Sequence, residues 1–267
     1  MDITQGVKWF GLQLLLLSFS LLSCAAHHPQ LTAQNSGASG MVYISAGYFL
    51  MGSAPQGGLT MMEAGVDEFP QQSVSLKAFW IDQHEVTTEQ YKQFVRATGH
   101  RHPPIWMDPA YPAPTPLHPV IDVSWDDAEA YCRWAGKRLP TEAEWEKAAR
   151  GTDGRIWPWG NTFDPAKANT MDSKKGWTLP VGSLEGDISL YGVHDMAGNA
   201  MEWTASWYQP YPGSTLQRVA FGEKYRVMKG GAWNTPAIPF SHAANRHAVA
   251  PQWDHPNHGF RCAKDAN

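Results

Sequence analysis

Lys137–Glu146 reads KRLPTEAEWE and Asp195–Trp203 reads DMAGNAMEW, and these two stretches decide the fold. In the first, Thr141 precedes Glu144 by three residues, which is the capping-box pattern of a helix start. We expect that helix to end at Gly151, because glycine readily adopts the left-handed conformation that closes a helix. The second stretch is rich in small residues and is expected to form a loop between short strands.

Two more helices are predicted from the same kinds of capping and terminating residues. One runs from Thr87 to Gly99, with Gln90 completing its capping box, and the other runs from Ser124 to Gly136. Short strands are expected where apolar runs lie between turn residues or alternate with polar residues, at Met41–Ile44, Gly47–Gly52 and Val74–Ile81.

Composition favours a loop-rich fold with an aromatic core. The 267 residues are 43% hydrophobic and only 17% charged, and they include 13 Trp, 24 Gly and 20 Pro. Aromatic side chains, rather than long helices, are therefore expected to supply much of the core. The Pro-rich run 103–119 is interpreted either as an ordered loop or lid, or as a plain surface excursion. A formal net charge of -4 without a basic run predicts no nucleic-acid partner.

The N-terminal residues 1–23 are predicted to be a signal peptide. An apolar stretch at 9–22 is too short to span a bilayer comfortably. It is followed by Cys24 in a pattern that resembles a bacterial lipoprotein signal, whose cysteine carries lipid. An ordinary secretory signal cleaved nearby is the alternative. Residues 24–40 are interpreted as a flexible tether and residues 41–267 as the folded domain.

Either signal predicts export from the cytoplasm. A lipidated Cys24 would attach the protein to the membrane of the cell envelope, on the periplasmic face or at the outer membrane, and Ala25 in place of an aspartate favours the latter. In that oxidising compartment the two remaining cysteines, Cys132 and Cys262, most simply form a disulfide.

Several motifs in order carry a resemblance to a known family. Besides the two opening stretches they are Asp82–Tyr91, Trp157–Asn161, Lys229–Trp233 and Gly259–Cys262. The chain resembles the formylglycine-generating enzyme, or sulfatase-modifying factor, family from Met41 to Asp265. The resemblance implies an irregular α+β domain, the family's variant of the C-type-lectin fold, with little regular secondary structure. It also implies a family disulfide between Cys132 and Cys262.

The chain departs from the family at the catalytic cysteines. Formylglycine-generating enzymes oxidise a substrate cysteine with two reactive cysteines that bind copper, and soft thiolates suit Cu(I). The matching positions, counted from Gly231, are Thr235 and Phe240. Neither residue supplies a thiolate, so the resemblance does not extend to formylglycine generation.

The resemblance implies up to two structural calcium sites. At the first, Asn199 and Glu202 would offer side-chain oxygens and Ala197, Gly198 and Ala200 backbone carbonyls. The alternative is that Asn199 and Glu202 are hydrogen-bonded turn residues without metal. At the second, weaker site are Asn169 and Thr170, where Lys175 stands near the expected acidic position and Asp172 is a substitute.

The C-terminal region is rich in histidine where the family builds its active cleft. His255, His258 and Asp254 form a speculative transition-metal set, since two histidines and a carboxylate are a recognised iron geometry. The alternative is surface or hydrogen-bonded loop histidines. His84 and His194 stand where the family often has Tyr and are expected to be packing residues. Three further side chains are candidates for lining the cleft, with core packing the alternative for the tryptophans: Trp233, Trp253 and Arg246.

Two functions follow from these features. The first is a binding, scaffold or accessory maturation lipoprotein with an envelope protein or peptide as partner. The second is a periplasmic oxidative maturation enzyme with metal-dependent, non-cysteine chemistry, as in the family's pyoverdine-maturation relatives. The lost cysteines favour the first function and the histidines motivate the second, so the sequence leaves open whether the protein is an enzyme.

Overall fold

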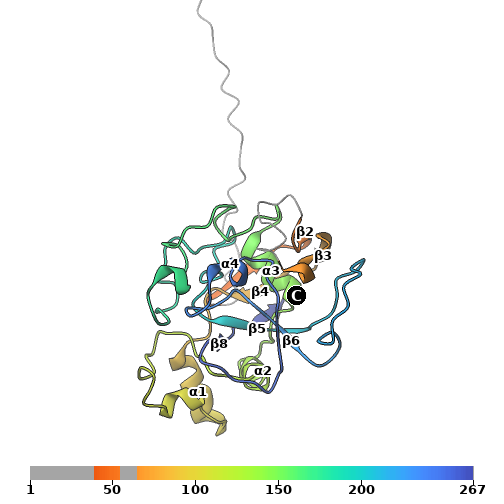
Figure 1. Cartoon of the computed structure of the whole chain (residues 1–267). Coiled ribbons are helices and arrows are strands. Elements are labelled where there is room, and N and C mark those ends of the chain that lie inside the picture. The colour runs from red at the N-terminus through yellow and green to blue at the C-terminus, as the bar shows by residue number, and fades with distance from the viewer. Residues whose placement is uncertain (1–38, 55–64, 267) are drawn as a thin grey trace, which may run out of the picture. The chain divides into compact units, whose positions relative to one another are not determined.

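Short strands and helices alternate with long loops through residues 39–54 and 65–266, which are the residues that the computed structural model describes (Figure 1). The predicted signal peptide, Cys24 and nearly all of the predicted tether lie outside the described residues. Within the described part of the chain, no helix is both long and apolar enough to span a bilayer.

Three small sheets organise the domain. An antiparallel sheet has the order β1 (Met41–Ile44), β4 (Phe79–Asp82), β9 (Ala263–Asp265). A hairpin pairs β2 (Gly47–Met51) with β3 (Gln72–Leu76). The four-stranded sheet has the order β7 (His247–Val249), β6 (Arg226–Lys229), β5 (Met201–Trp207), β8 (His258–Gly259), with β5 and β8 parallel.

The prediction of a single strand over Val74–Ile81 is wrong. The chain forms β3 and β4 there, and the two strands belong to different sheets. The alternating pattern stops at Lys77 and Ala78, after which Phe79 and Ile81 are buried in the core. A short alternating run therefore could not reveal that the chain changes sheets halfway.

The three predicted helices are confirmed. They are α1 (Thr88–Thr98), α2 (Trp125–Trp134) and α3 (Glu142–Arg150). Each begins with a capping box, in which the hydroxyl of the N-cap residue accepts from a backbone N–H three residues later. α1 packs against α2, whereas α3 packs against the β2–β3 hairpin and the four-stranded sheet (Figure 1). Four shorter turns complete the elements: η1 (Val66–Glu68), η2 (Pro104–Met107), η3 (Met171–Ser173) and α4 (Ala237–Phe240).

Aromatic side chains fill the core, as composition predicted. Trp145 and Trp203 are fully buried and Trp157 is 1% exposed. The largest apolar cluster joins α1 and α2 to the four-stranded sheet through ring contacts among Tyr91, Phe94, Tyr131 and Phe260. Each large ring buries about 150–250 Å², so a core can form between short elements.

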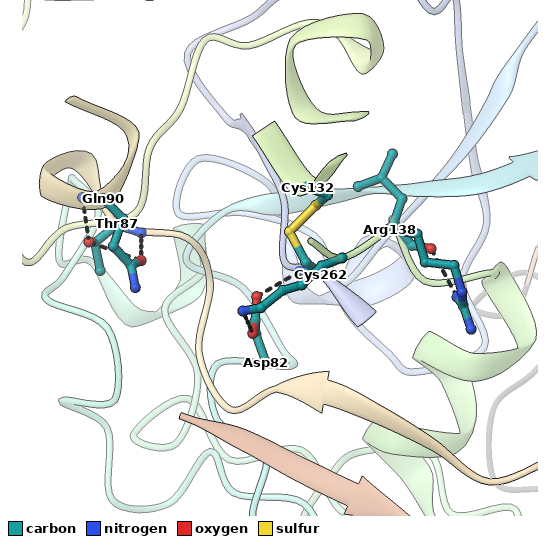
Figure 2. The surroundings of a disulfide bond; sticks show 8 residues. Asp82, Thr87, Gln90, Cys132, Arg138 and Cys262 are labelled. Carbon is teal, nitrogen blue, oxygen red and sulfur yellow. Dashed lines mark hydrogen bonds and ion pairs between the residues drawn. A yellow bond between two sulfur atoms is a disulfide. The ribbon is translucent and has the colours of Figure 1, made fainter. Parts of the chain in front are cut away.

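The disulfide between Cys132 and Cys262 is present and fully buried (Figure 2). It joins α2 to the segment before β9, with Cα atoms 5.7 Å apart and a sequence separation of 130 residues. Asp82 Oδ2 accepts from the backbone N–H of Cys262 at 3.0 Å. In the chain-entropy model, a loop of this length contributes about 5 kcal/mol to the free energy of unfolding.

Candidate functional site

The loop that precedes β5 carries the first predicted calcium residues. Gly198 and Asn199 both have positive φ, 109° and 62°. Asn199 Oδ1 accepts from Asn169 Nδ2 at 3.0 Å and from the backbone N–H of Leu179 at 2.8 Å. Its Nδ2 donates to Glu85 Oε2 at 2.7 Å, while Oε1 of Glu85 accepts from the next backbone N–H in the loop at 2.9 Å. The Asn199 oxygen is therefore already satisfied by protein donors.

Glu202 is likewise committed to protein partners. The side chain is fully buried, and its two oxygens accept from Arg261 Nε and Nη2, each at 2.7 Å. Trp145 Nε1 donates to the same carboxylate at 2.8 Å. Calcium ligation through Glu202 would require Arg261 to be displaced. As arranged, the Asn199 and Glu202 side chains do not fit a calcium ion, which agrees with the hydrogen-bonded alternative.

Asn169 and Thr170 fit a cation better than the first set. They are 1% and 0% exposed, and Asn169 Oδ1 and Thr170 Oγ1 have no hydrogen-bond partner. Hard oxygen atoms that lack a donor are the ligands calcium prefers. Asp172 is exposed and Oδ2 accepts from the backbone N–H of Ala237 at 2.6 Å, while Lys175 is exposed.

A cluster of buried carboxylates surrounds Arg261. Burial and the neighbouring charge of Asp195 raise the pKa values of Glu85 and Asp187 well above their usual range. Burial raises the pKa of Asp195 itself to about 6. The guanidinium of Arg261 lowers all three pKa values, but burial and the neighbouring carboxylates outweigh it. Sequence reasoning missed Glu85, although it lies in the quoted motif Asp82–Tyr91.

The positions of the family's catalytic cysteines lie at the α4 turn. Thr235 Oγ1 accepts from the backbone N–H of Ala232 at 2.8 Å, so the hydroxyl closes a turn. The Phe240 ring lies edge-on to His247 with ring centres 5.9 Å apart. Neither side chain offers a thiolate, and both described cysteines are closed in the disulfide.

The structure does not bring the speculative metal set onto one centre. Asp254 accepts from Arg101 at 2.9 Å. His258 is buried edge-on against Trp203, and burial lowers its pKa to about 3. His255 lies with its ring centre 5.5 Å from that of His258. Among the residues that the structure describes, no three His, Cys, Asp or Glu side chains converge to hold a metal ion.

A chain of polar groups runs from His255 towards the α4 turn. Asn257 Nδ2 donates to Asn234 Oδ1 at 2.9 Å, which leaves Asn257 Oδ1 as an acceptor 2.7 Å from His255 Nδ1. This contact places the His255 ring against the Asn257 side chain. Trp233 Nε1 donates to the carbonyl of Pro256 at 3.2 Å, which holds the two loops together.

An aromatic groove lies beside Trp233. The Trp177 ring is 4.7 Å from Trp233 and 5.7 Å from Tyr111 between ring centres. Trp177, Trp106 and residues of the Pro-rich run 103–119 line a shallow groove that is open to solvent and has a cavity volume of about 20 Å³. The Pro-rich run therefore forms one wall of this shallow groove, while most of its residues are exposed on the surface.

The other predicted cleft residues lie elsewhere. Arg246 is 6% exposed, and its guanidinium donates to Glu142 at 2.5 and 3.0 Å, so it is a buried structural cation. Trp253 is 61% exposed, so it does not pack in the core. Trp233 is the one of the three that contacts the aromatic groove.

Comparisons with known proteins agree with this fold. A family model described as the sulfatase-modifying factor enzyme 1-like domain matches residues 27–266. The inactive C-alpha-formylglycine-generating enzyme 2 of Mus musculus is 34% identical over 302 residues, which cover 92% of this chain and 91% of that protein. The serine/threonine-protein kinase Pkn1 of Chlamydia trachomatis is 35% identical over 251 residues, but the match covers only 38% of that protein. The structure of PvdO from Pseudomonas aeruginosa aligns with a TM-score of 0.70 and 29% identity over 85% of this chain and 94% of that chain.

Proposed function

The chain belongs to the sulfatase-modifying factor family, and from that premise we propose that it is a binding member which does not generate formylglycine. Its fold is the irregular α+β variant of the C-type-lectin fold that the family uses. The protein is exported and attached through Cys24 to the cell envelope, where it acts as a scaffold or accessory maturation protein. The apolar stretch ahead of Cys24 supports the anchor.

The observation that carries this proposal is the loss of thiols at the catalytic positions. Thr235 and Phe240 replace the cysteines, and Cys132 and Cys262 are bonded to each other. No free thiol remains among the described residues to bind Cu(I) or engage a substrate cysteine. A cysteine peptide incubated with the protein, copper, oxygen and a thiol reductant is expected to keep its thiol unconverted to an aldehyde by mass spectrometry.

The aromatic groove is the proposed binding site, and its ligand is an extended peptide segment of an envelope protein. Trp106, Trp177 and Tyr111 offer flat apolar faces for side chains such as proline. Trp106 and Trp177 are partly exposed, and each indole has one N–H group that can donate to a peptide carbonyl. Large rigid rings bind with little loss of side-chain entropy.

A linear peptide library displayed on phage tests the groove. Selected peptides should bind the Trp177→Ala and Trp106→Ala variants at least tenfold more weakly, which corresponds to about 1.4 kcal/mol. Trp253→Ala is the matched control, because Trp253 is exposed outside the groove. Selection of no peptide, or unchanged affinity in Trp177→Ala, would remove the groove as the site.

The second candidate is an oxidative maturation enzyme with metal-dependent chemistry. The 29% identity to PvdO over 94% of that chain favours it. Elemental analysis of the purified protein separates the two functions. Stoichiometric iron or copper that disappears in the His255→Ala, His258→Ala double variant would replace the scaffold proposal with the enzyme. Calcium alone, or no metal, would support the scaffold.

A further inference from the structure

Two histidines outside the groove lie ring to ring. His84 follows β4, and His194 precedes the loop that leads into β5. Their ring centres are 4.8 Å apart, and the ring planes are inclined by 35°. The backbone N–H of His194 donates to the carbonyl of Gln83 at 2.9 Å, which places the two segments side by side. Both histidines were expected to be packing residues.

Neither ring has a protein partner that explains it. His194 Nδ1 is buried without a hydrogen-bond partner. No hydrogen bond to a ring nitrogen of His84 occurs within residues 39–54 and 65–266. Gly182 lies against His84 and has φ of 72°, and a Cβ there would come within 2.6 Å of Nε2. A buried polar atom without a partner is costly, so a ligand at His194 Nδ1 would remove this cost.

The charge state of the pair suits metal ligation. Burial, the other imidazole and Arg261 together lower the pKa of His84 to about 4. Burial and Arg261 also lower the pKa of His194. Arg261 donates to the carbonyl of His194 at 2.8 Å, and Asp195 accepts from the N–H of Gly182 at 2.6 Å. A neutral imidazole has one ring nitrogen with a free lone pair, which is the atom that a metal ion binds.

We propose that His84 and His194 together bind one divalent first-row transition ion, such as Zn²⁺ or Cu²⁺, with water completing its coordination. Bonds of about 2.0–2.1 Å at angles of about 90–110° place the centres of two such rings about 4.5–5.2 Å apart. The observed 4.8 Å lies inside this range, whereas 5.5 Å between His255 and His258 lies outside it. Imidazole favours copper, nickel and zinc over calcium, so this site differs in ligand type from the predicted calcium sites. Neither histidine lines the groove.

Metal titration of the purified, tag-free chain tests the site. Isothermal titration with Zn²⁺, and electron paramagnetic resonance with Cu²⁺, should show one ion per chain with two nitrogen ligands. His84→Gln and His194→Gln should each weaken binding at least tenfold, and excess Ca²⁺ should not compete. His247→Gln is the matched control, since His247 contacts Phe240 and lies apart from the pair.

Circular dichroism confirms that each variant remains folded, and a variant that does not fold is replaced by the other single substitution. Unchanged stoichiometric binding in both His84→Gln and His194→Gln would overturn the proposal. Absence of binding in the wild-type chain, or loss only in His255→Gln, would overturn it equally. These outcomes do not depend on peptide binding, so the test of the metal site and the test of the groove are independent of each other.

Discussion

At the scale of single residues, the Glu202–Arg261 pair is the centre of the buried charge. Both side chains are fully buried, and Arg261 also donates to backbone carbonyls at 82, 83 and 194. A buried guanidinium that loses its carboxylate remains as an uncompensated charge. The pair therefore acts as a structural clamp between β5, the loop before it and the chain near Cys262.

We expect Glu202→Gln to lower the free energy of unfolding by about 3–5 kcal/mol, because Arg261 is then buried without its partner. Urea unfolding at neutral pH measures this loss. Glu129→Gln is the control: Glu129 pairs with Arg133 on the surface, with 28% and 73% exposed side chains, and should cost less than about 0.5 kcal/mol. Equal effects of the two substitutions would mean that the buried pair is not a clamp.

A calcium ion is proposed at Asn169 and Thr170 because their oxygens lack donors. Saturating Ca²⁺ at about 100 times the dissociation constant should raise the melting temperature of chelator-treated protein by about 5–10 °C. Asn169→Ala should abolish this increase, whereas Mg²⁺ should not reproduce it. A melting temperature that is insensitive to Ca²⁺ in the wild type would leave both predicted calcium sites without support.

At the scale of elements, the sequence predicted helices well and strands less well. The capping boxes at Thr87, Ser124 and Thr141 all form, because a cap depends on residues only three positions apart. The partners of β3 and β4 are instead distant in sequence, and β4 pairs with β9 near the C-terminus. A pattern of alternating residues does not specify such a partner, so the run Val74–Ile81 was assigned as one strand.

The disulfide connects α2 to the chain before β9, and its removal should loosen that connection. The Cys132→Ala, Cys262→Ala double variant should lose about 2–5 kcal/mol of unfolding free energy. In unreduced, denatured wild-type protein, alkylation should label neither cysteine. Labelling of both residues would show that the bridge does not form in the cell, and unchanged stability in the double variant would contradict its structural role.

At the scale of the whole molecule, two titratable groups change the free energy of unfolding in opposite directions as the pH changes. His84 has a folded-state pKa of about 4, below its ordinary 6.5, so its stabilising contribution is present above pH 6.5 and lost as pH falls towards 4. Asp195 has a raised pKa of about 6, so its contribution is present below its ordinary pKa of 3.8 and lost as pH rises through 6. The two trends partly cancel between pH 4 and 6.

Substitution of His84 should expose this balance. Between pH 7 and pH 5, His84→Gln should lose about 1 kcal/mol less unfolding free energy than the wild type, after allowance for solvent screening of a half-buried ring. Chelator in every sample removes any contribution from bound metal. Parallel pH profiles of variant and wild type would show that His84 does not titrate as its environment implies.

The sequence by itself determined the family, the three capped helices, the aromatic core and the absence of thiols at 235 and 240. The resemblance to the family also implied the disulfide between Cys132 and Cys262, which the structure contains. These features depend on residue identity or on neighbours within a few positions. A reader of the sequence alone could therefore exclude the thiol chemistry of the family without any coordinates.

Only the tertiary structure decided which polar groups meet. It directed Glu202 to Arg261, left the oxygens of Asn169 and Thr170 without donors and brought His84 against His194. It also laid the Pro-rich run 103–119 beside Trp177 to form the groove. Each of these contacts joins segments far apart in the chain, and the cost of burying a polar group depends on the partner that folding supplies. That partner is not encoded near the residue itself.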